Sequence, residues 1–355
     1  MAIHDAFTAP KVEGVTARIQ FTNHLINNSD VQGGSPLLSG ASGRLWASSD
    51  GQVRLELQVD AGSEGATSDA QFLLDGHQLT VYDSGTNTVY KADLPAGNKD
   101  SGDAAQDQPP SVAEIQKKLA RLMEHVTVSG AEPSDVAGQP AYTVRIGPKQ
   151  NGGLIGGAEL AWDAIHGTPL RAAVYAKGDS SPVIELKVND ISYGPVSSSV
   201  FDVTPPAGAK VTDLTPQGTN RDQPGGQADS APVTGLAEVQ KAVPFEIAAP
   251  DSLVGLSRSE VRLIHSGDQP AALVTYGKGL DGIAVIEHAA DSKTSSGTSG
   301  DQGQLSLPKV SINGVQGEEL ETPLGTLIHF QRSGVDYTVI GSVDSATAQA
   351  AAQGL

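Results

Sequence analysis

The sequence predicts an α+β protein made mostly of β-strands, with one prominent helix and a smaller, mostly β second domain. The main observation is a period of two, in which apolar residues alternate with polar or small ones over short segments bounded by Gly and Pro. This pattern is typical of antiparallel strands joined by hairpins. The composition agrees, because 41 glycines and 21 prolines accompany only 4% aromatic residues, which suits strands and turns better than a helical bundle.

A linker divides the chain into two domains. Residues 213–235 contain Pro216 and Pro224 and almost no large apolar residue, a composition typical of flexible connections. We therefore expect a first domain over residues 1–212, a linker over 213–235 and a second domain over 236–355. A chain of 355 residues is long enough for both.

The first domain opens with amphipathic strands. In residues 53–59, Val53, Leu55, Leu57 and Val59 alternate with polar residues, and the Ser-Asp-Gly turn at 49–51 predicts a hairpin with the preceding strand. Further strands are expected over residues 12–26, 38–48, 72–74, 79–82, 88–92, 126–130 and 141–146.

The clearest helix of the chain is expected to begin at Ser111. Ser111 and Glu114 form a capping box, in which each side chain satisfies a free backbone donor of the other. Apolar residues then recur at spacings of three and four, which gives one apolar stripe. The stripe contains Val112, Ile115, Leu119, Leu122, Met123 and Val126.

Residues 159–211 carry several features in a fixed order. Leu160 and Trp162 alternate along a strand that ends in Asp163, a His-Gly-Thr-Pro turn follows, and a second alternating strand leads to Gly178. The next alternating run, 183–193, places Ile184, Leu186 and Val188 on one side. Pro205 and Pro206 then exclude a central strand, because proline has no backbone donor.

This order resembles the lipoprotein-carrier superfamily, which includes the carrier LolA, its relative LolB and the envelope-stress regulator RseB. The matching residues are Trp162-Asp163, the G-T-P-L-R turn at 167–171 and the segment from Phe201 to the P-P-A-G at 205–208. The phrase L-D-G-H-Q-L-T-V-Y-D at 74–83 is also similar to the family. The resemblance implies a curved antiparallel sheet, an open half-barrel, with the helix across its concave face.

The second domain is expected to begin with a short helix at 236–243 and to end with a helix over 345–355 that Ser345 caps. Between them, short alternating runs predict strands, with a Ser/Gly-rich insertion at 291–303. The stretch 274–344 resembles a small C-terminal domain of Gram-positive envelope and sporulation-associated proteins. An acidic run at Glu318, Glu319 and Glu321 is expected to lie on a solvated edge strand, where charge deters pairing.

Composition also excludes several classes of function. The 41 acidic and 23 basic residues give a net charge of −18, whereas nucleic-acid binding needs a basic stripe. The absence of cysteine excludes disulfides and thiolate catalysis. The eight histidines form no HExxH motif and no i, i+4 pair, so we expect no metal site, no cofactor and no enzymatic activity. His77 and His166 are expected to be solvated turn residues.

A curved sheet crossed by a helix can leave an apolar cleft, and such a cleft suits acyl chains because each buried methylene contributes roughly 0.8 kcal/mol. Alternatively, the helix stripe only completes a packed core and no site exists. If the cleft is open, its walls are the apolar residues of the first strands and the helix. These are Phe21, Leu45, Leu55, Leu57, Phe72, Leu74, Leu119 and Met123.

Two functions follow from these features. The first is a non-enzymatic carrier or chaperone that binds a lipid or acylated protein in the cleft. The second is a regulatory or scaffolding protein, similar to RseB, whose two domains bind another envelope protein. The resemblance implies an extracytoplasmic location, and we expect an export signal or membrane anchor upstream of residue 1.

Overall fold

The structure is a computed structural model of the full chain. It describes residues 12–26, 40–59, 69–76, 78–85, 87–93, 126–149, 152–204, 206–213, 233–266, 269–279, 282–290 and 307–355. The predicted helix that begins at Ser111, the insertion at 291–303 and most of the predicted linker lie outside these residues. The described residues divide into two compact units.

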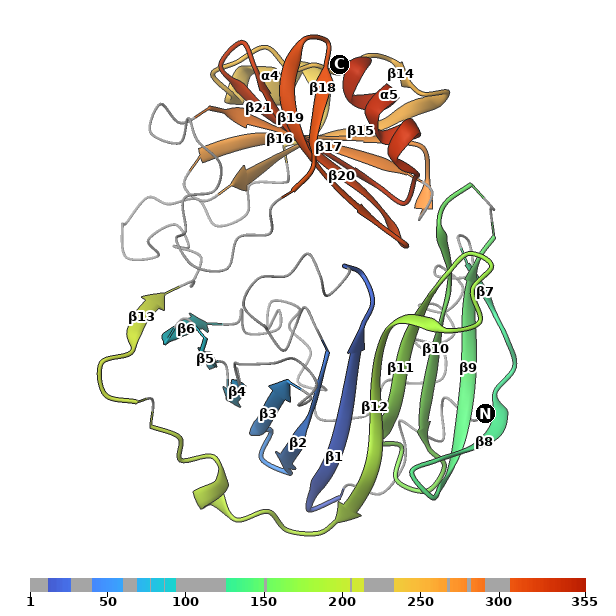
Figure 1. The fold of residues 1–355 in the computed structure, drawn as a ribbon, viewed down its shortest axis with the longest axis vertical. Coiled ribbons are helices and arrows are strands. Elements are labelled where there is room, and N and C mark those ends of the chain that lie inside the picture. The colour runs from blue at the N-terminus through green and yellow to red at the C-terminus, as the bar shows by residue number, and fades with distance from the viewer. Residues whose placement is uncertain are drawn as a thin grey trace, which may run out of the picture. The chain divides into compact units, whose positions relative to one another are not determined.

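The first unit is built on a 13-stranded sheet that curls into an open half-barrel, the shape that the family resemblance implies (Figure 1). Its order is β13-β6-β5-β4-β3-β2-β1-β12-β11-β10-β9-β7, with β8 paired to β9. The first strand therefore lies at the centre, between the hairpins that follow it and the strands that end the unit. The strands are β1 (Gly14–Asn23), β2 (Ala41–Ser48), β3 (Val53–Val59), β4 (Asp69–Asp75), β5 (Gln78–Asp83), β6 (Thr88–Asp93), β7 (Val126–Val128), β8 (Glu132–Val136), β9 (Gln139–Pro148), β10 (Ile155–Asp163), β11 (Pro169–Ala176), β12 (Pro182–Tyr193) and β13 (Lys210–Asp213).

Two of these strands were not expected from the sequence. β8 has the sequence EPSDV, whose Pro, Ser and Asp indicate a turn, yet it pairs antiparallel with β9. β13 pairs parallel with β6, with Val211 opposite Val89. Because β13 is only four residues long and its partner is distant in the chain, no local pattern marks it.

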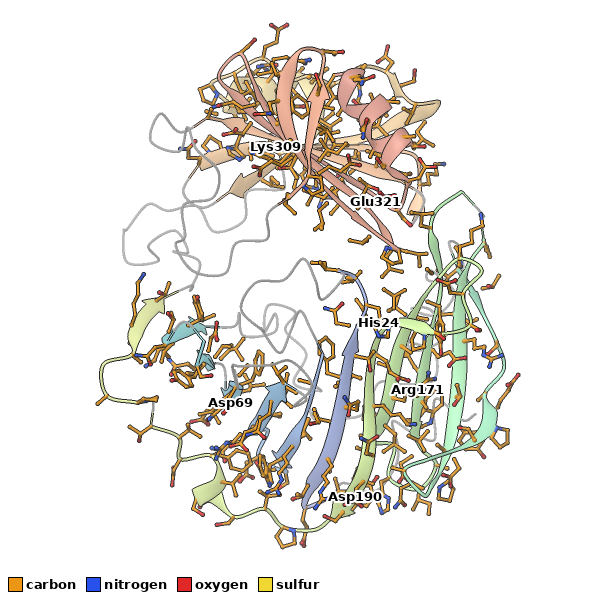
Figure 2. The ribbon with its side chains drawn as sticks, in the orientation of Figure 1. His24, Asp69, Arg171, Asp190, Lys309 and Glu321 are labelled. Atoms are coloured by element: carbon orange, nitrogen blue, oxygen red, sulfur yellow. The ribbon has the colours of Figure 1, made fainter. Side chains whose placement is uncertain are left out.

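The predicted face of β12 is confirmed. Its register places Ile184 opposite Asn23, Leu186 opposite Phe21 and Val188 opposite Ile19, so all three lie on one side of the sheet. After Val188 the register against β1 shifts, because Arg18 lies opposite Asp190, and one residue of β12 bulges out. Asp190 lies near the end of this strand (Figure 2). Val188 and Ile191 are buried, whereas Leu186 is 40% exposed. The three residues share one side but differ in burial, because the neighbouring strands and the bulge decide how far each is covered.

The second unit contains an 8-stranded antiparallel sheet with the order β14-β15-β16-β17-β21-β20-β19-β18. Its core is one apolar cluster that includes Val274, Val285 and Phe330. The strands are β14 (Ser252–Leu253), β15 (Leu256–Ser266), β16 (Gln269–Tyr276), β17 (Ile283–Ala289), β18 (Lys309–Ile312), β19 (Val315–Thr322), β20 (Gly325–Arg332) and β21 (Val335–Gly341).

Two helices complete the described part of the second unit, α4 (Leu236–Ala242) and α5 (Ser345–Gln353). Both were expected, but the cap of α5 is Asp344 rather than Ser345. The Asp344 side chain accepts a hydrogen bond of 2.8 Å from the backbone N–H of Thr347. Val239 of α4 and Ala348, Ala351 and Ala352 of α5 are buried in the core cluster.

The acidic run of β19 does not lie on an edge strand. β19 pairs with both β18 and β20, so it lies inside the sheet. Glu319 is only 6% exposed, and its Oε2 accepts a hydrogen bond of 2.8 Å from Gln349 of α5. The expected solvated edge is therefore wrong for Glu319, whose face is covered by the terminal helix.

Candidate functional site: an apolar face of the first sheet

One face of the first sheet carries an unbroken row of apolar side chains. Residues opposite each other in an antiparallel sheet point to the same face. The register places Ala17 opposite Leu45, Leu45 opposite Leu55, and Leu55 opposite Phe72. The row continues through Val81 of β5 to Tyr90 of β6. We call this side of the sheet the apolar face.

Two further rows flank the first on the same face. One contains Ile19, Gly43, Leu57 and Ala70, in register from β1 to β4. The other contains Val15, Ala47, Val53 and Leu74. Both rows are apolar on these strands, so the face is two-dimensional rather than a single stripe.

The structure thus brings six of the predicted cleft residues onto one face. Leu45, Leu55 and Phe72 share the central row, while Leu57 and Leu74 lie in the flanking rows. Phe21 lies on the same face of β1, opposite Ala41. The remaining two predicted cleft residues, Leu119 and Met123, lie outside the described residues.

Burial varies along the face. Ala17 and Ile19 are 3% and 2% exposed, and Leu57 is 3% exposed, so these residues belong to the core. Leu45, Leu55 and Phe72 are half-buried and pack against that core. The buried residues therefore tie the face to the core of the first unit. Leu45, Leu55 and Phe72, on β2 to β4, keep accessible apolar surface.

The sequence missed residues that extend the face. Leu186 of β12 lies opposite Phe21 and is 40% exposed, and Val81 and Tyr90 continue the central row. Alternation in the short strands 79–82 and 88–92 was a usable signal for Val81 and Tyr90. Alternation over residues 183–193 also placed Leu186 on one side with Ile184 and Val188, but only the pairing of β12 with β1 shows that this side continues the apolar face.

A buried polar cluster lies at the turn after β10. Asp163 is 0% exposed; its Oδ1 accepts hydrogen bonds of 2.7 Å from the backbone N–H groups of Ile165 and His166, and its Oδ2 accepts one of 2.7 Å from the Tyr193 hydroxyl. Burial acts to raise the pKa of Asp163, but these hydrogen bonds outweigh it and hold the pKa below its usual value. The cluster fixes the turn through a carboxylate.

His166 is not the solvated residue that the sequence predicts. Its ring stacks on Tyr193 with the ring centroids 3.8 Å apart, and its Nδ1 lies 3.2 Å from Asp163 Oδ1. The aspartate of the W-D motif and the histidine of the following turn therefore act together, and both hold the turn to the end of β12. Both residues therefore have a structural role in this turn.

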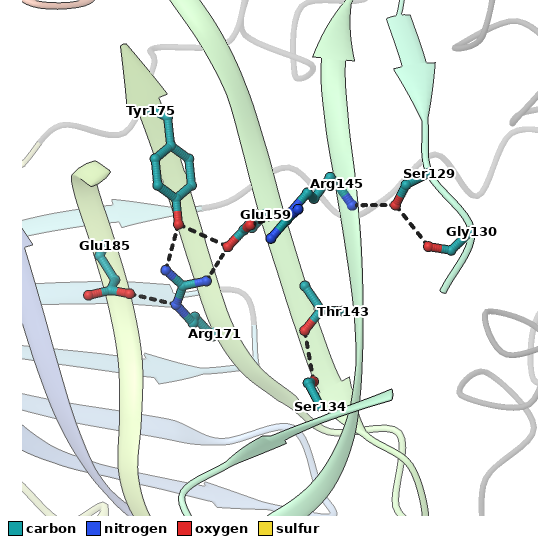
Figure 3. A network of polar contacts seen from close by, with 9 residues as sticks. All are labelled: Ser129, Gly130, Ser134, Thr143, Arg145, Glu159, Arg171, Tyr175 and Glu185. Carbon is teal, nitrogen blue, oxygen red and sulfur yellow. Dashed lines mark hydrogen bonds and ion pairs between the residues drawn. The ribbon is translucent and has the colours of Figure 1, made fainter. Parts of the chain in front are cut away.

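A second polar network crosses β10, β11 and β12 (Figure 3). Arg171 donates to Glu159, to Glu185 at 2.5 Å and to the Tyr175 hydroxyl at 2.7 Å. Arg145 donates to the other oxygen of Glu159 at 2.6 Å. Burial acts to raise the pKa of Glu159, yet its bonds to Arg171, Arg145 and Tyr175 lower the pKa overall. Two cations thus match two anions, which indicates a structural role.

The described residues contain no group of three or more His, Asp or Glu side chains placed to hold a metal ion. Within the same residues, no helix is long and apolar enough to cross a membrane. The strongest feature of the first unit is therefore its apolar face, whose chemistry is suited to burying an apolar ligand.

No model of a known protein family matches this chain, and no curated protein matches it. Among solved structures, the chain is similar to MucB in the Pseudomonas aeruginosa MucA/MucB complex, with 15% identity and a TM-score of 0.45 over 99% of this chain and 94% of that one. It is also similar to LprF from Mycobacterium bovis, with 12% identity and a TM-score of 0.26 over 58% of this chain and 97% of that one. A LolA superfamily protein from Nitrosomonas europaea shows 9% identity and a TM-score of 0.22 over 57% of this chain and 96% of that one.

Proposed function

We propose that the first unit is a non-enzymatic binding module that buries the acyl chain of a lipid or lipoprotein against its apolar face. The observation that supports this most is the row formed by Leu45, Leu55 and Phe72, which is continuous in register yet only half-buried. A linear acyl chain matches a linear row, because each methylene can contact successive side chains along it.

The binding energy comes from apolar contact alone. Each buried methylene contributes roughly 0.8 kcal/mol, so about ten methylenes contribute roughly 8 kcal/mol of gross free energy against the cost of immobilising the ligand. Leu186, 40% exposed at the border of the face, supplies further accessible apolar surface. We place this module on the extracytoplasmic side of a membrane, where acylated proteins and lipids are its partners.

Native mass spectrometry tests the proposal. The purified chain is incubated with a lipopeptide or phospholipid and sprayed under non-denaturing conditions, and we expect a mass increase equal to one ligand. Leu55→Arg places a charge in the central row and is expected to reduce the bound fraction by about tenfold or more, because burying an unpaired cation is costly.

The matched control is Ile340→Arg. Ile340 is also an aliphatic strand residue and is 43% exposed, but it lies on β21 of the second unit. This variant should bind like the wild-type protein, and circular dichroism should show that both variants are folded. An unliganded mass that persists after incubation with lipids would exclude the acyl-binding proposal and indicate a closed core.

A second candidate is a regulatory protein that binds another envelope protein through both units. The observation that favours it is that the second unit has its own large apolar core and its own sheet, separate from the first sheet. Cross-linking in cells followed by mass spectrometry separates the two candidates. A protein partner that is retained by Leu55→Arg would favour regulation over acyl binding.

A further inference from the structure

A groove lies on the other face of the first sheet, opposite the apolar face. It has a volume of about 270 Å³ and is bounded by β3 to β6 and by the chain after β12. Its polar and charged lining residues are Arg54, Gln71, Gln78, Thr80, Tyr82, Lys91 and Thr204, and its apolar ones are Phe72, Leu73, Val203 and Pro206.

The floor of the groove is one row of the sheet. Arg54 lies opposite Leu73, Leu73 opposite Thr80, and Thr80 opposite Lys91. Neighbouring strands are about 4.8 Å apart, so the backbones of Arg54 and Lys91 are separated by roughly 14 Å. Two long basic side chains therefore border the groove from its two ends, with a small hydroxyl residue between them.

One wall is formed by the segment that follows β12. Arg54 Nη1 donates a hydrogen bond of 2.6 Å to the carbonyl of Val200, which ends the 3₁₀ helix Ser198–Val200. Phe201 is only 5% exposed, so this part of the segment is packed rather than free. Arg54 thus positions the wall as well as lining the groove.

Every charged residue of the lining is a cation. Arg54 pairs with Glu56 and lies over the Trp46 ring at 5.5 Å, but its Nε is buried without a hydrogen-bond partner. Lys91 forms no ion pair with any residue that the structure describes. The carboxylate of Asp75, at the end of β4, does not line the groove and accepts a hydrogen bond of 3.1 Å from Gln52. Lys91 is therefore the cation of the lining without an ion-pair partner among the described residues, in a chain whose net charge is −18.

We propose that this groove binds an oxyanion, namely a phosphate group. Lysine and arginine are the usual protein ligands of phosphate oxygens, and hydroxyl and amide donors complete such sites. Lys91 contacts the anion directly, the Thr80 hydroxyl donates a hydrogen bond, and Arg54 supplies positive potential from the far end. The Tyr82 hydroxyl borders the site but donates to Asn87 Oδ1 at 3.2 Å. Phe72 belongs to both the groove lining and the apolar face, but the charged and polar strand residues of the groove alternate with those of that face, so they lie on the opposite side of the sheet.

A titration of the full chain with inorganic phosphate tests this site. Backbone amide resonances of Thr80 and Lys91 are followed by nuclear magnetic resonance at constant ionic strength, and we expect saturable shifts. Lys91→Gln removes the charge while keeping a polar side chain of similar length. It should weaken phosphate binding by about tenfold, the effect of losing one charge-assisted hydrogen bond.

Lys187→Gln is the matched control, because Lys187 is an exposed lysine on β12 of the same sheet. It changes the net charge equally and should leave the phosphate affinity within about twofold of the wild-type value, the range expected when only a distant, screened charge is lost. Equal weakening by both variants, or no saturable shift in the wild-type protein, would overturn the proposal.

The phosphate can belong to a free metabolite or to a lipid headgroup, and a second arm separates these sources. Vesicles of phosphatidylcholine with and without phosphatidylglycerol are sedimented with the wild-type protein and with Lys91→Gln. Binding to vesicles that is lost in Lys91→Gln assigns the site to a headgroup, whereas phosphate binding without vesicle binding assigns it to a soluble ligand. Leu55→Arg should keep phosphate binding, which distinguishes this site from the acyl site.

Discussion

Glu287 is a carboxylic acid in the core of the second unit. It is 0% exposed and lies on β17, opposite Ala272 on one side and Tyr337 on the other. Its Oε2 accepts a hydrogen bond of 2.9 Å from the backbone N–H of Ala248, but its Oε1 is buried without a partner. Burial raises the pKa of Glu287 to about 7, although the Ala248 bond and the charge of Arg332 act in the opposite direction.

This raised pKa predicts a pH-dependent stability. The folded state keeps the proton of Glu287 up to about pH 7, whereas the unfolded state loses it near its ordinary pKa of 4.5. The free energy of unfolding should therefore be highest below pH 4.5 for this group and should fall as the pH rises to about 7. The total loss is roughly 3 kcal/mol.

The measurement is urea unfolding of the wild-type protein and of Glu287→Gln between pH 4 and pH 8. The amide of glutamine has nearly the shape of the protonated acid and does not titrate, so it should remove this fall. Histidines and other acids titrate in both proteins, and the difference between the two curves isolates Glu287. A difference that stays constant with pH would show that folding does not raise the pKa of Glu287.

At the scale of strands and helices, the local patterns predicted which strands form and which side chains share a face. They did not predict which strands pair with one another. The strand at 53–59 has the predicted bounds, and its alternation placed Leu55 and Leu57 on the face where the structure has them. Asp163 and His166 were found as a motif, but their shared contact with Tyr193 was not, because Tyr193 is distant in the chain. The bulge in β12 was missed for the same reason.

The cap of α5 gives a prediction at the same scale. Asp344 lies just before the helix, and its hydrogen bond with Thr347 lowers the pKa of Asp344. Asp344→Ala removes the acceptor for a free N–H group of the first turn, so it should lower the thermal unfolding midpoint of the second unit by a few degrees. Ser345→Ala, at the position that the sequence favoured, should have a smaller effect. Equal shifts would indicate that Asp344 does not act as the cap.

At the scale of the whole molecule, the described residues form two separate apolar clusters, one in each compact unit. The first cluster contains Ile19 and the second contains Val285, and neither shares a buried residue with the other. The predicted boundary at 213–235 rests on composition, and it separates these clusters in the chain. Two cores of this kind suit a binding protein, since each can keep its own fold while a ligand occupies one of them.

We therefore expect the chain to unfold in two cooperative transitions. Ile19→Ala and Val285→Ala each remove buried methyl groups, at 2% and 0% exposure, and each should cost roughly 1–4 kcal/mol in its own unit. Differential scanning calorimetry should show that Ile19→Ala lowers one midpoint and Val285→Ala the other, because mutations in separate cores act independently. An acyl ligand should raise only the midpoint that Ile19→Ala lowers, since binding to a folded unit stabilises that unit. One transition that both substitutions shift alike would mean that the two cores fold as a single unit.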